Sequence, residues 1–398
     1  MPSERLPGDA RSAFLPPAAI GTSPRRVRSR TLDGQKWQVT MHAKNTTLRD
    51  VAVRAGISLQ TVSNVANGRS ARMSEETCAR VLAAIAELNY RPNAAARSLR
   101  NVPVGVLALA IPDLMNPYFT EVGTVIVAEA AARGYTVLLD YTNREREQEL
   151  LVAAGLRPHL IDGLILDAQR LTTEDLKAGQ LPIVLLGERV YDGPYDHVVI
   201  DNVAAARLAT EHLIAIGRRR IAAIGLWDPP ARGAPHLRLR GYLEALDAAG
   251  LDADPQLQAH AFKWHRAPGA AAMRALLALP DPPDAVFCFA DLLAVGAISA
   301  LHQAGIRIPE DVAVVGFDDV EDARFTVPPL TSISPDKAAI GKLSVDLLIQ
   351  RVTGTRTAPP QCFEQPFELV VRQSTVDARA TLAATALSGS AHVAVGSS

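Results

Sequence analysis

The chain has 398 residues, of which 48% are hydrophobic and 21% charged, enough for a small module plus one or two larger domains. The three cysteines lie far apart without metal-ligand spacing, and no run of eighteen apolar residues occurs, which argues against a metal site, a disulfide framework and a membrane span. The formal net charge is −1, but residues 41–100 carry nine Lys and Arg against four Asp and Glu, whereas residues 101–398 carry 25 against 35. A basic head on an acidic body favours a polyanionic partner that is bound by the head alone.

Residues 1–46 are predicted to be a disordered extension. They are rich in Pro, Arg, Ser and Gly and show no hydrophobic periodicity. They also lack the apolar stretch of a secretory signal, so export is not expected. The protein is therefore predicted to be cytoplasmic, where its cysteines remain reduced.

Residues 47–68, TLRDVAVRAGISLQTVSNVANG, predict two short helices joined by a tight turn. Thr47 is suited to cap the first helix, and Asp50 completes a capping box three residues later. Gly56 tolerates the positive φ that a sharp reversal of the chain requires.

The second of these helices begins after Ser58, a suitable N-cap, and its inward positions are taken by Val62 and Val65. This is the pattern of a helix-turn-helix motif, whose second helix lies in the major groove of DNA. The alternative is an ordinary helical hairpin. The residues expected on or near its outer face are Leu59, Gln60, Thr61, Ser63 and Asn64.

A third helix is predicted from Ser74, its N-cap, to the residues before Pro92, which cannot continue a helix. Residues 93–101 then form a segment too short to be a stable helix by itself in water. On composition alone this segment is a linker. The apolar face that closes the three-helix head is predicted to consist of Val81, Leu82, Ile85 and Leu88.

The words D-V-A-x-x-A-G-I-S-x-x-T-V-S-N-x-x-N-G in residues 50–68 closely resemble the start of the lactose repressor (LacI/GalR) family of bacterial transcription regulators. The resemblance implies a DNA-binding domain over residues 47–92, and a hinge helix over 93–101 that orders on operator DNA and inserts its leucine into the minor groove. Members of the family usually begin just ahead of the motif, so an alternative is that translation starts at Met41 and residues 1–40 are an artefact of start-codon choice. The DNA-binding residues that the motif and the resemblance imply are Thr47, Ser58, Leu59, Gln60, Thr61, Ser63, Asn64, Asn67, Asn93, Arg97 and Leu99.

From Val102 onward the pattern changes to apolar runs of strand length separated by helical segments, which predicts parallel sheets covered by helices in two subdomains. The resemblance likewise implies a periplasmic-binding-protein-like fold of two Rossmann-like subdomains over residues 102–376, with crossovers near 203, 331 and 362. Residues 377–398 are predicted to be a disordered tail without leucine heptads. Strands are expected at 104–111, 135–140, 162–166, 182–186, 197–200, 220–225, 285–289 and 312–317, and helices at 118–133, 145–156, 202–216, 238–250, 267–279 and 292–304.

Ligands of such folds bind beyond the carboxyl ends of the strands, where the loop after the first strand carries Asn116, Tyr118 and Phe119. Phe119 could equally be a core residue. The resemblance implies further effector contacts from Arg238, whose guanidinium suits hydroxyls or carboxylates, and from Trp264, whose indole suits a sugar face.

Two acidic residues complete the candidate set that the resemblance implies. Asp318 ends a buried strand where it can bind two hydroxyls, whereas Asp319 is expected to be structural. Asp291 follows Ala290, where the family often has an asparagine that reaches the ligand, and this departure weakens the closest sugar analogies.

The sequence thus predicts an all-α helix-turn-helix head on an α/β body, acting as a dimeric repressor that needs no cofactor. Its partners would be a palindromic double-stranded operator and a small effector, most simply a sugar, with a nucleoside corepressor as the alternative. A sugar-binding protein without a regulatory role would share the body but lack the head. An enzyme would require a catalytic group set, and none is visible in the sequence.

Overall fold

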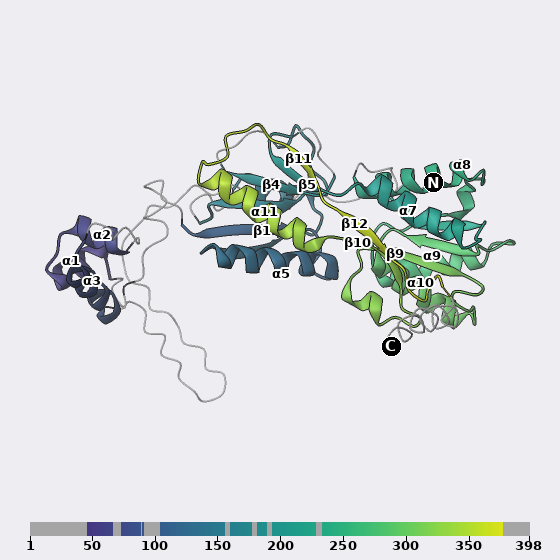
Figure 1. The fold of residues 1–398 in the computed structure, drawn as a ribbon, viewed down its shortest axis with the longest axis horizontal. Helices are drawn as coiled ribbons and strands as arrows, with labels where there is room; N and C mark the ends of the chain where they lie inside the picture. The colour runs from purple at the N-terminus through teal and green to yellow at the C-terminus, as the bar shows by residue number, and fades with distance from the viewer. Residues whose placement is uncertain are drawn as a thin grey trace, which may run out of the picture. The chain divides into compact units, whose positions relative to one another are not determined.

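The computed structural model describes residues 46–66, 73–88, 90, 104–155, 160–176, 181–188, 193–227 and 233–376. These residues fall into two compact units, an N-terminal head that ends at Arg91 and a body that begins at Pro92 (Figure 1). None of the helices in the described part combines the length and apolar character that a bilayer crossing requires.

The head consists of three helices, α1 (Leu48–Ala55), α2 (Leu59–Ala66) and α3 (Glu75–Glu87). Thr47 and Asp50 form the predicted capping box at the start of α1, and Gly56 ends that helix with a φ of 64°. One fully buried valine from each helix forms the centre of the small core, namely Val51, Val62 and Val81. The sequence therefore specifies both the caps and the inward faces of α1 and α2.

Two side chains of the head lie on other faces than predicted. Leu82 was predicted to lie in the core but is 56% exposed. Ala84 is buried in its stead, because Ala84 lies three residues after Val81 and therefore on the same side of α3. Ser63 is buried rather than on the outer face of α2, because it directly follows the inward-facing Val62 and borders the core.

The body contains two six-stranded sheets with the orders β11-β5-β4-β3-β1-β2 and β12-β10-β9-β8-β6-β7. All neighbouring strands are parallel except β10 and β12, which are antiparallel. The strands of the first sheet are β1 (Val106–Ile111), β2 (Thr136–Tyr141), β3 (Gly163–Asp167), β4 (Ile183–Leu186), β5 (Asp196–Val199) and β11 (Cys362–Glu364). Those of the second are β6 (Ile221–Leu226), β7 (Gln258–His260), β8 (Ala285–Cys288), β9 (Ala313–Phe317), β10 (Thr331–Pro335) and β12 (Phe367–Val370).

Each sheet and its helices form one lobe of the body. In the first lobe α5 (Pro117–Ala132) and α11 (Lys337–Val352) run side by side along one face of the sheet, and α6 (Arg146–Ala153) follows β2 (Figure 1). In the second lobe α7 (Asn202–Ala215) packs against α8 (Ala234–Ala248), and α9 (Arg266–Leu277) packs against α10 (Asp291–Gln303). The chain passes to the second lobe after β5, returns after β10 to form α11 and β11, and passes over again to form β12.

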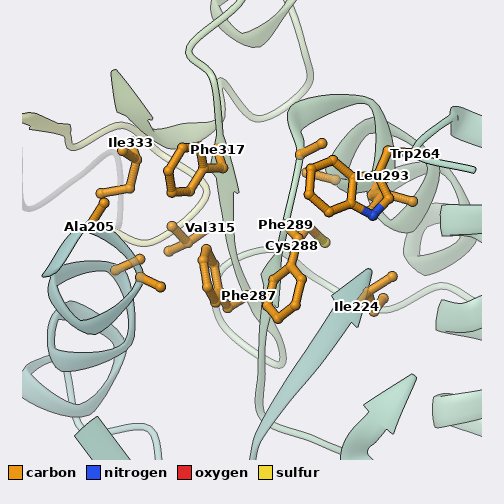
Figure 2. Close-up of a cluster of buried hydrophobic side chains, with 14 of the residues drawn as sticks. Ala205, Ile224, Trp264, Phe287, Cys288, Phe289, Leu293, Val315, Phe317 and Ile333 are labelled. Atoms are coloured by element: carbon orange, nitrogen blue, oxygen red, sulfur yellow. The ribbon is translucent and has the colours of Figure 1, made fainter. Parts of the chain in front are cut away.

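The core of the second lobe is rich in aromatic side chains. Figure 2 shows Phe287, Val315 and Phe317 between Ala205 of α7 and the side chains around Phe289. Most of the inner strands are buried along their whole length, which is the pattern of parallel strands covered on both faces. This burial fixes the carboxyl ends of the strands, and the loops that follow them, in one arrangement.

Candidate functional site

The exposed side of α2 presents two amide side chains. Gln60 and Asn64 lie four residues apart, and Nε2 of Gln60 donates to Oδ1 of Asn64 over 3.4 Å. Leu59 is 45% exposed beside them. The face is therefore polar, with one apolar side chain at its N-terminal end.

Three other predicted DNA-binding residues of the head also serve its local structure. The Thr47 hydroxyl donates to Asp50 within the capping box. Ser58 caps α2, since its Oγ accepts from the backbone N–H of Thr61 at 3.2 Å and lies 2.8 Å from the Thr61 hydroxyl. The remaining predicted residues, Asn67, Asn93, Arg97 and Leu99, lie outside the described part of the chain.

A cavity with about 870 Å³ of empty space, part of it open to solvent, lies at the carboxyl ends of strands from both sheets of the body. The structure brings six of the predicted effector residues to its wall, which are Asn116, Tyr118, Phe119, Arg238, Trp264 and Asp318.

Arg238 is the central cation of this cavity and is only 6% exposed. Its Nε donates to Oδ1 of Asn202 over 2.7 Å, and its Nη1 donates to the carbonyl oxygen of Phe289. The same Nη1 lies 3.9 Å from Oδ1 of Asp318, and the guanidinium lies over the ring of Phe317, 3.3 Å from its centroid. Burial lowers the Arg238 pKa, and the nearby carboxylates oppose that effect.

The acidic side of the cavity consists of Asp167 at the end of β3, Glu188 after β4 and Asp318 after β9. Burial raises the pKa of Asp167 to about 7, and hydrogen bonding from Gln169 opposes the shift. Burial also raises the pKa of Asp318 to about 7, against the attraction of Arg238. The pKa of Glu188 is raised by burial as well. The site thus holds three carboxyl groups at a cost in desolvation.

Two of the predicted residues are held by the protein itself. Asn116 is buried and caps α5, because its Oδ1 accepts from the backbone N–H of Tyr118 at 3.1 Å. Trp264 donates from Nε1 to the carbonyl oxygen of Gly225 over 2.9 Å, and its ring contacts Phe289 edge-on. Their positions are therefore fixed before any ligand arrives.

The structure does not bring Asp291 to the cavity, so its prediction as an effector contact is corrected. Asp291 is fully buried, and its carboxylate accepts from the backbone N–H of Val320 at 2.9 Å and from the hydroxyl of Ser332 at 2.6 Å. It fastens α10 to the loop after β9 and to β10. Asp319 is buried too, and its Oδ1 lies 2.7 Å from Nη1 of Arg372, which confirms its structural role.

Sequence reasoning missed four charged or aromatic residues of the cavity wall, namely Arg144, Asp167, Glu188 and Trp227. Three of them stand at or within two residues of the end of a strand whose position was predicted. A search of every strand end for polar or aromatic side chains would have found these three.

Among the described residues, no group of three His, Cys, Asp or Glu is arranged to hold a metal ion.

Polar contacts join the two lobes around the cavity. Nε2 of His265 lies 2.8 Å from Oδ2 of Asp113, and the Arg170 guanidinium lies over the rings of Trp227 and Phe262. On another side, Lys337 donates from Nζ to the carbonyl oxygen of Asp319 over 2.8 Å. These contacts hold the lobes together in the described conformation.

Comparison with known proteins identifies relatives of both the head and the body. Residues 47–93 match the family model of bacterial regulatory proteins, lacI family, and residues 210–375 match a periplasmic binding protein-like domain. The ribose operon repressor of Escherichia coli K12 is 37% identical over 318 residues, which cover 77% of this chain and 93% of that protein.

Solved structures give the same result. A lac repressor dimer bound to operator and to the anti-inducer ONPF aligns with a TM-score of 0.73 and 30% identity, covering 84% of this chain and 100% of that one. The transcriptional regulator CelR in complex with cellobiose aligns with a TM-score of 0.61 and 34% identity, covering 83% of this chain and 99% of that one. The chain is a DNA-binding repressor, not an enzyme, and belongs to the lacI family of bacterial regulatory proteins.

Proposed function

We propose that this repressor acts in the cytoplasm as a homodimer on a palindromic operator, and that a sugar-like effector in the cavity controls its affinity for that operator. The observation that carries the proposal is the composition of the cavity wall, which combines Asp167 and Glu188 of the first lobe with Arg238 and Asp318 of the second. A ligand that contacts both lobes stabilises one arrangement of the lobes over the others. If operator affinity depends on that arrangement, it then responds to the ligand.

Operator contact is assigned to the outer face of α2 and to residues 93–101 as a hinge helix. Gln60 and Asn64 can each pair with an adenine through two hydrogen bonds in the major groove. Leu99 would unstack a base step in the minor groove.

A sugar is the favoured class of effector because the cavity combines carboxylates and a guanidinium with the aromatic rings of Tyr118 and Trp264. Two relatives, a ribose operon repressor and a regulator solved in complex with cellobiose, support the same class. A nucleoside acting as corepressor is the alternative.

The homodimer is supported by exposed apolar side chains on β2, an edge strand of the first sheet. Leu138, Leu139 and Tyr141 are 38%, 56% and 45% exposed. Leu139 and Tyr141 lie on the same face of this strand, and such exposed apolar side chains on an edge strand favour burial against another surface. The lac repressor relative is described as a dimer on its operator.

The test begins with selection of an operator from a random duplex library by the purified full chain. Sugars and nucleosides are then screened for a shift in melting temperature, and each one that shifts it is added to an anisotropy titration of the operator. A ligand of the cavity should change operator affinity at least tenfold and lose that effect in Asp318→Asn. Operator affinity that responds to no sugar and no nucleoside would refute effector control.

A further inference from the structure

Three carboxyl side chains line the cavity together with the phenol of Tyr118. Asp167, Glu188 and Asp318 are each at most 8% exposed. Burial raises the pKa of Tyr118, and the charges of the three carboxylates, which line the same cavity, add to that rise. Their like charges therefore meet in one small, poorly hydrated volume.

Both guanidinium groups at the cavity wall are already engaged with the protein. Arg238 donates to Asn202 and to the carbonyl oxygen of Phe289. Arg144 lies 3.6 Å from the Asp113 carboxylate through its Nη2 and also over the ring of Trp227. By formal count three carboxyl groups face these two cations at the cavity wall, and one of the cations, Arg144, is paired with Asp113 as well.

Two polar groups of the wall lack a close partner. The Asp318 side chain is 7% exposed and makes no hydrogen bond to another described residue, its ion pair with Arg238 being 3.9 Å long. Nε1 of Trp227 is buried and likewise has no hydrogen-bond partner within the described ranges. Unpaired buried groups cost free energy, so this wall favours a ligand that brings donors for the carboxylate and an acceptor for the indole.

We propose that the effector is an amino sugar whose ammonium group lies among Asp167, Glu188 and Asp318. The proposal rests on the proposed function and specifies the charge of its ligand. An ammonium group supplies three donors and a positive charge, which compensates the carboxylates more completely than neutral hydroxyls do. A hydroxyl or the ring oxygen of the sugar accepts from the Trp227 indole.

Isothermal titration of the full chain at pH 7 tests this with matched pairs of sugars, namely glucosamine and glucose, galactosamine and galactose, and mannosamine and mannose. N-acetylglucosamine is added as a ligand that keeps the nitrogen but loses the charge. At least one amino sugar should bind tenfold or more tightly than its neutral partner. The proposal is overturned if no amino sugar binds, or if the neutral partner binds as tightly in every pair.

Two variants with the same change of charge separate the role of the site from general electrostatics. Glu188→Gln should reduce the ratio of affinities within the best pair to less than threefold. Glu147→Gln, on the exposed surface of α6, should leave that ratio unchanged. An unchanged ratio in Glu188→Gln would count against the proposal.

The operator titration distinguishes the two levels of the argument. If neutral sugars alone change operator affinity, the amino-sugar assignment is wrong and the proposed effector control stands. If amino sugars bind but leave operator affinity unchanged, the ligand class is right and the regulatory role of the cavity is wrong.

Discussion

Nε2 of His265 lies 2.8 Å from Oδ2 of Asp113, so the residue before α9 in the second lobe contacts the loop after β1 in the first. The Asp113 side chain is 10% exposed and that of His265 is 29% exposed, which keeps water partly away from the pair. The contact joins the two lobes without involving any ligand. It therefore stabilises the described arrangement of the lobes before an effector binds.

A double-mutant cycle measures this contact. We expect His265→Gln and Asp113→Asn each to destabilise the body, with a coupling free energy of about 0.5–1 kcal/mol, as is common for partly exposed pairs. Thermal and denaturant unfolding give the four free energies. Strictly additive effects would show that the two side chains do not act together.

Asn64→Ala should weaken binding to the selected operator by ~1–3 kcal/mol and relax the base preference at one position of each half-site. The structure adds that Gln60 loses its 3.4 Å hydrogen-bond partner in this variant. Anisotropy with operators altered at single positions provides the measurement. Equal weakening on operator and on random DNA would remove Asn64 from the base-reading residues.

Asp318→Asn should raise the effector concentration for half-maximal response at least tenfold and leave operator affinity without effector within about twofold. The substitution keeps the size of the side chain and removes the charge. Trp264→Ala is a poorer probe, since deletion of a buried Trp costs about 3–5 kcal/mol of stability, so Trp264→Phe is the better second variant. Joint loss of folding and operator binding in Asp318→Asn would favour a purely structural role.

The pH dependence of stability reports on the buried carboxyls. The pKa of Asp167 is about 7 in the folded chain, against 3.8 as its ordinary value, so the folded state retains a proton that the unfolded state releases between these values. The folded protein binds more protons there, and the stability contribution falls as pH rises through that window. His197, whose pKa is lowered by burial to about 4, acts in the opposite direction below about pH 6.5.

The comparison is therefore made between pH 6.5 and 8, where most of the contribution of His197 is over and the remainder is common to the wild type and the variant. Asp167→Asn should reduce the loss of stability over this interval by roughly 1 kcal/mol, since one pKa unit corresponds to about 1.4 kcal/mol. Asp247→Asn, on the exposed surface of α8, is the matched control. Identical slopes in the wild type and Asp167→Asn would contradict the raised pKa.

Gly296→Ala should destabilise the second lobe by about 1–3 kcal/mol through overpacking. A Cβ at Gly296 would lie 2.0 Å from the carbonyl oxygen of Arg266, and one at Gly269 would lie 2.3 Å from that of Leu293. The backbones of α9 and α10 thus approach each other at these two glycines. Calorimetry of Gly296→Ala beside Ser299→Ala, an exposed position on α10, measures the effect, and equal melting temperatures would contradict the close approach.

The parts of the fold that sequence predicted are those with strong apolar periodicity and clear caps. The strands from β1 to β6, together with β8 and β9, fall within a few residues of their predicted ranges. The strand β10 was not predicted because it has no apolar run. Its buried residues include the polar Thr331 and Ser332, which make hydrogen bonds to Ser374 and Asp291. The helix α11 mixes Gly341 and Ser344 into its buried face, which weakens its apolar stripe.

The sequence predicted which residues follow the ends of strands, but not which of their side chains line the cavity. Asp318 and Asp291 both follow strands of the second sheet, yet only Asp318 lines the cavity. The direction of Asp291 depends on Ser332, which lies 41 residues away in sequence and on another strand. Contacts between residues so far apart in sequence arise from tertiary packing, and local sequence patterns do not predict them.

The order of the strands also has a consequence for synthesis. The edge strand β11 of the first sheet and the antiparallel β12 of the second both follow residue 361, after every other strand of the body has been made. Neither sheet is complete when its earlier strands leave the ribosome, because each sheet needs a strand from residues 362–370, which are synthesised later. A chain that stops before Cys362 should therefore leave both lobes incomplete. A chimaera that exchanges one lobe between relatives must exchange two separate segments of the gene.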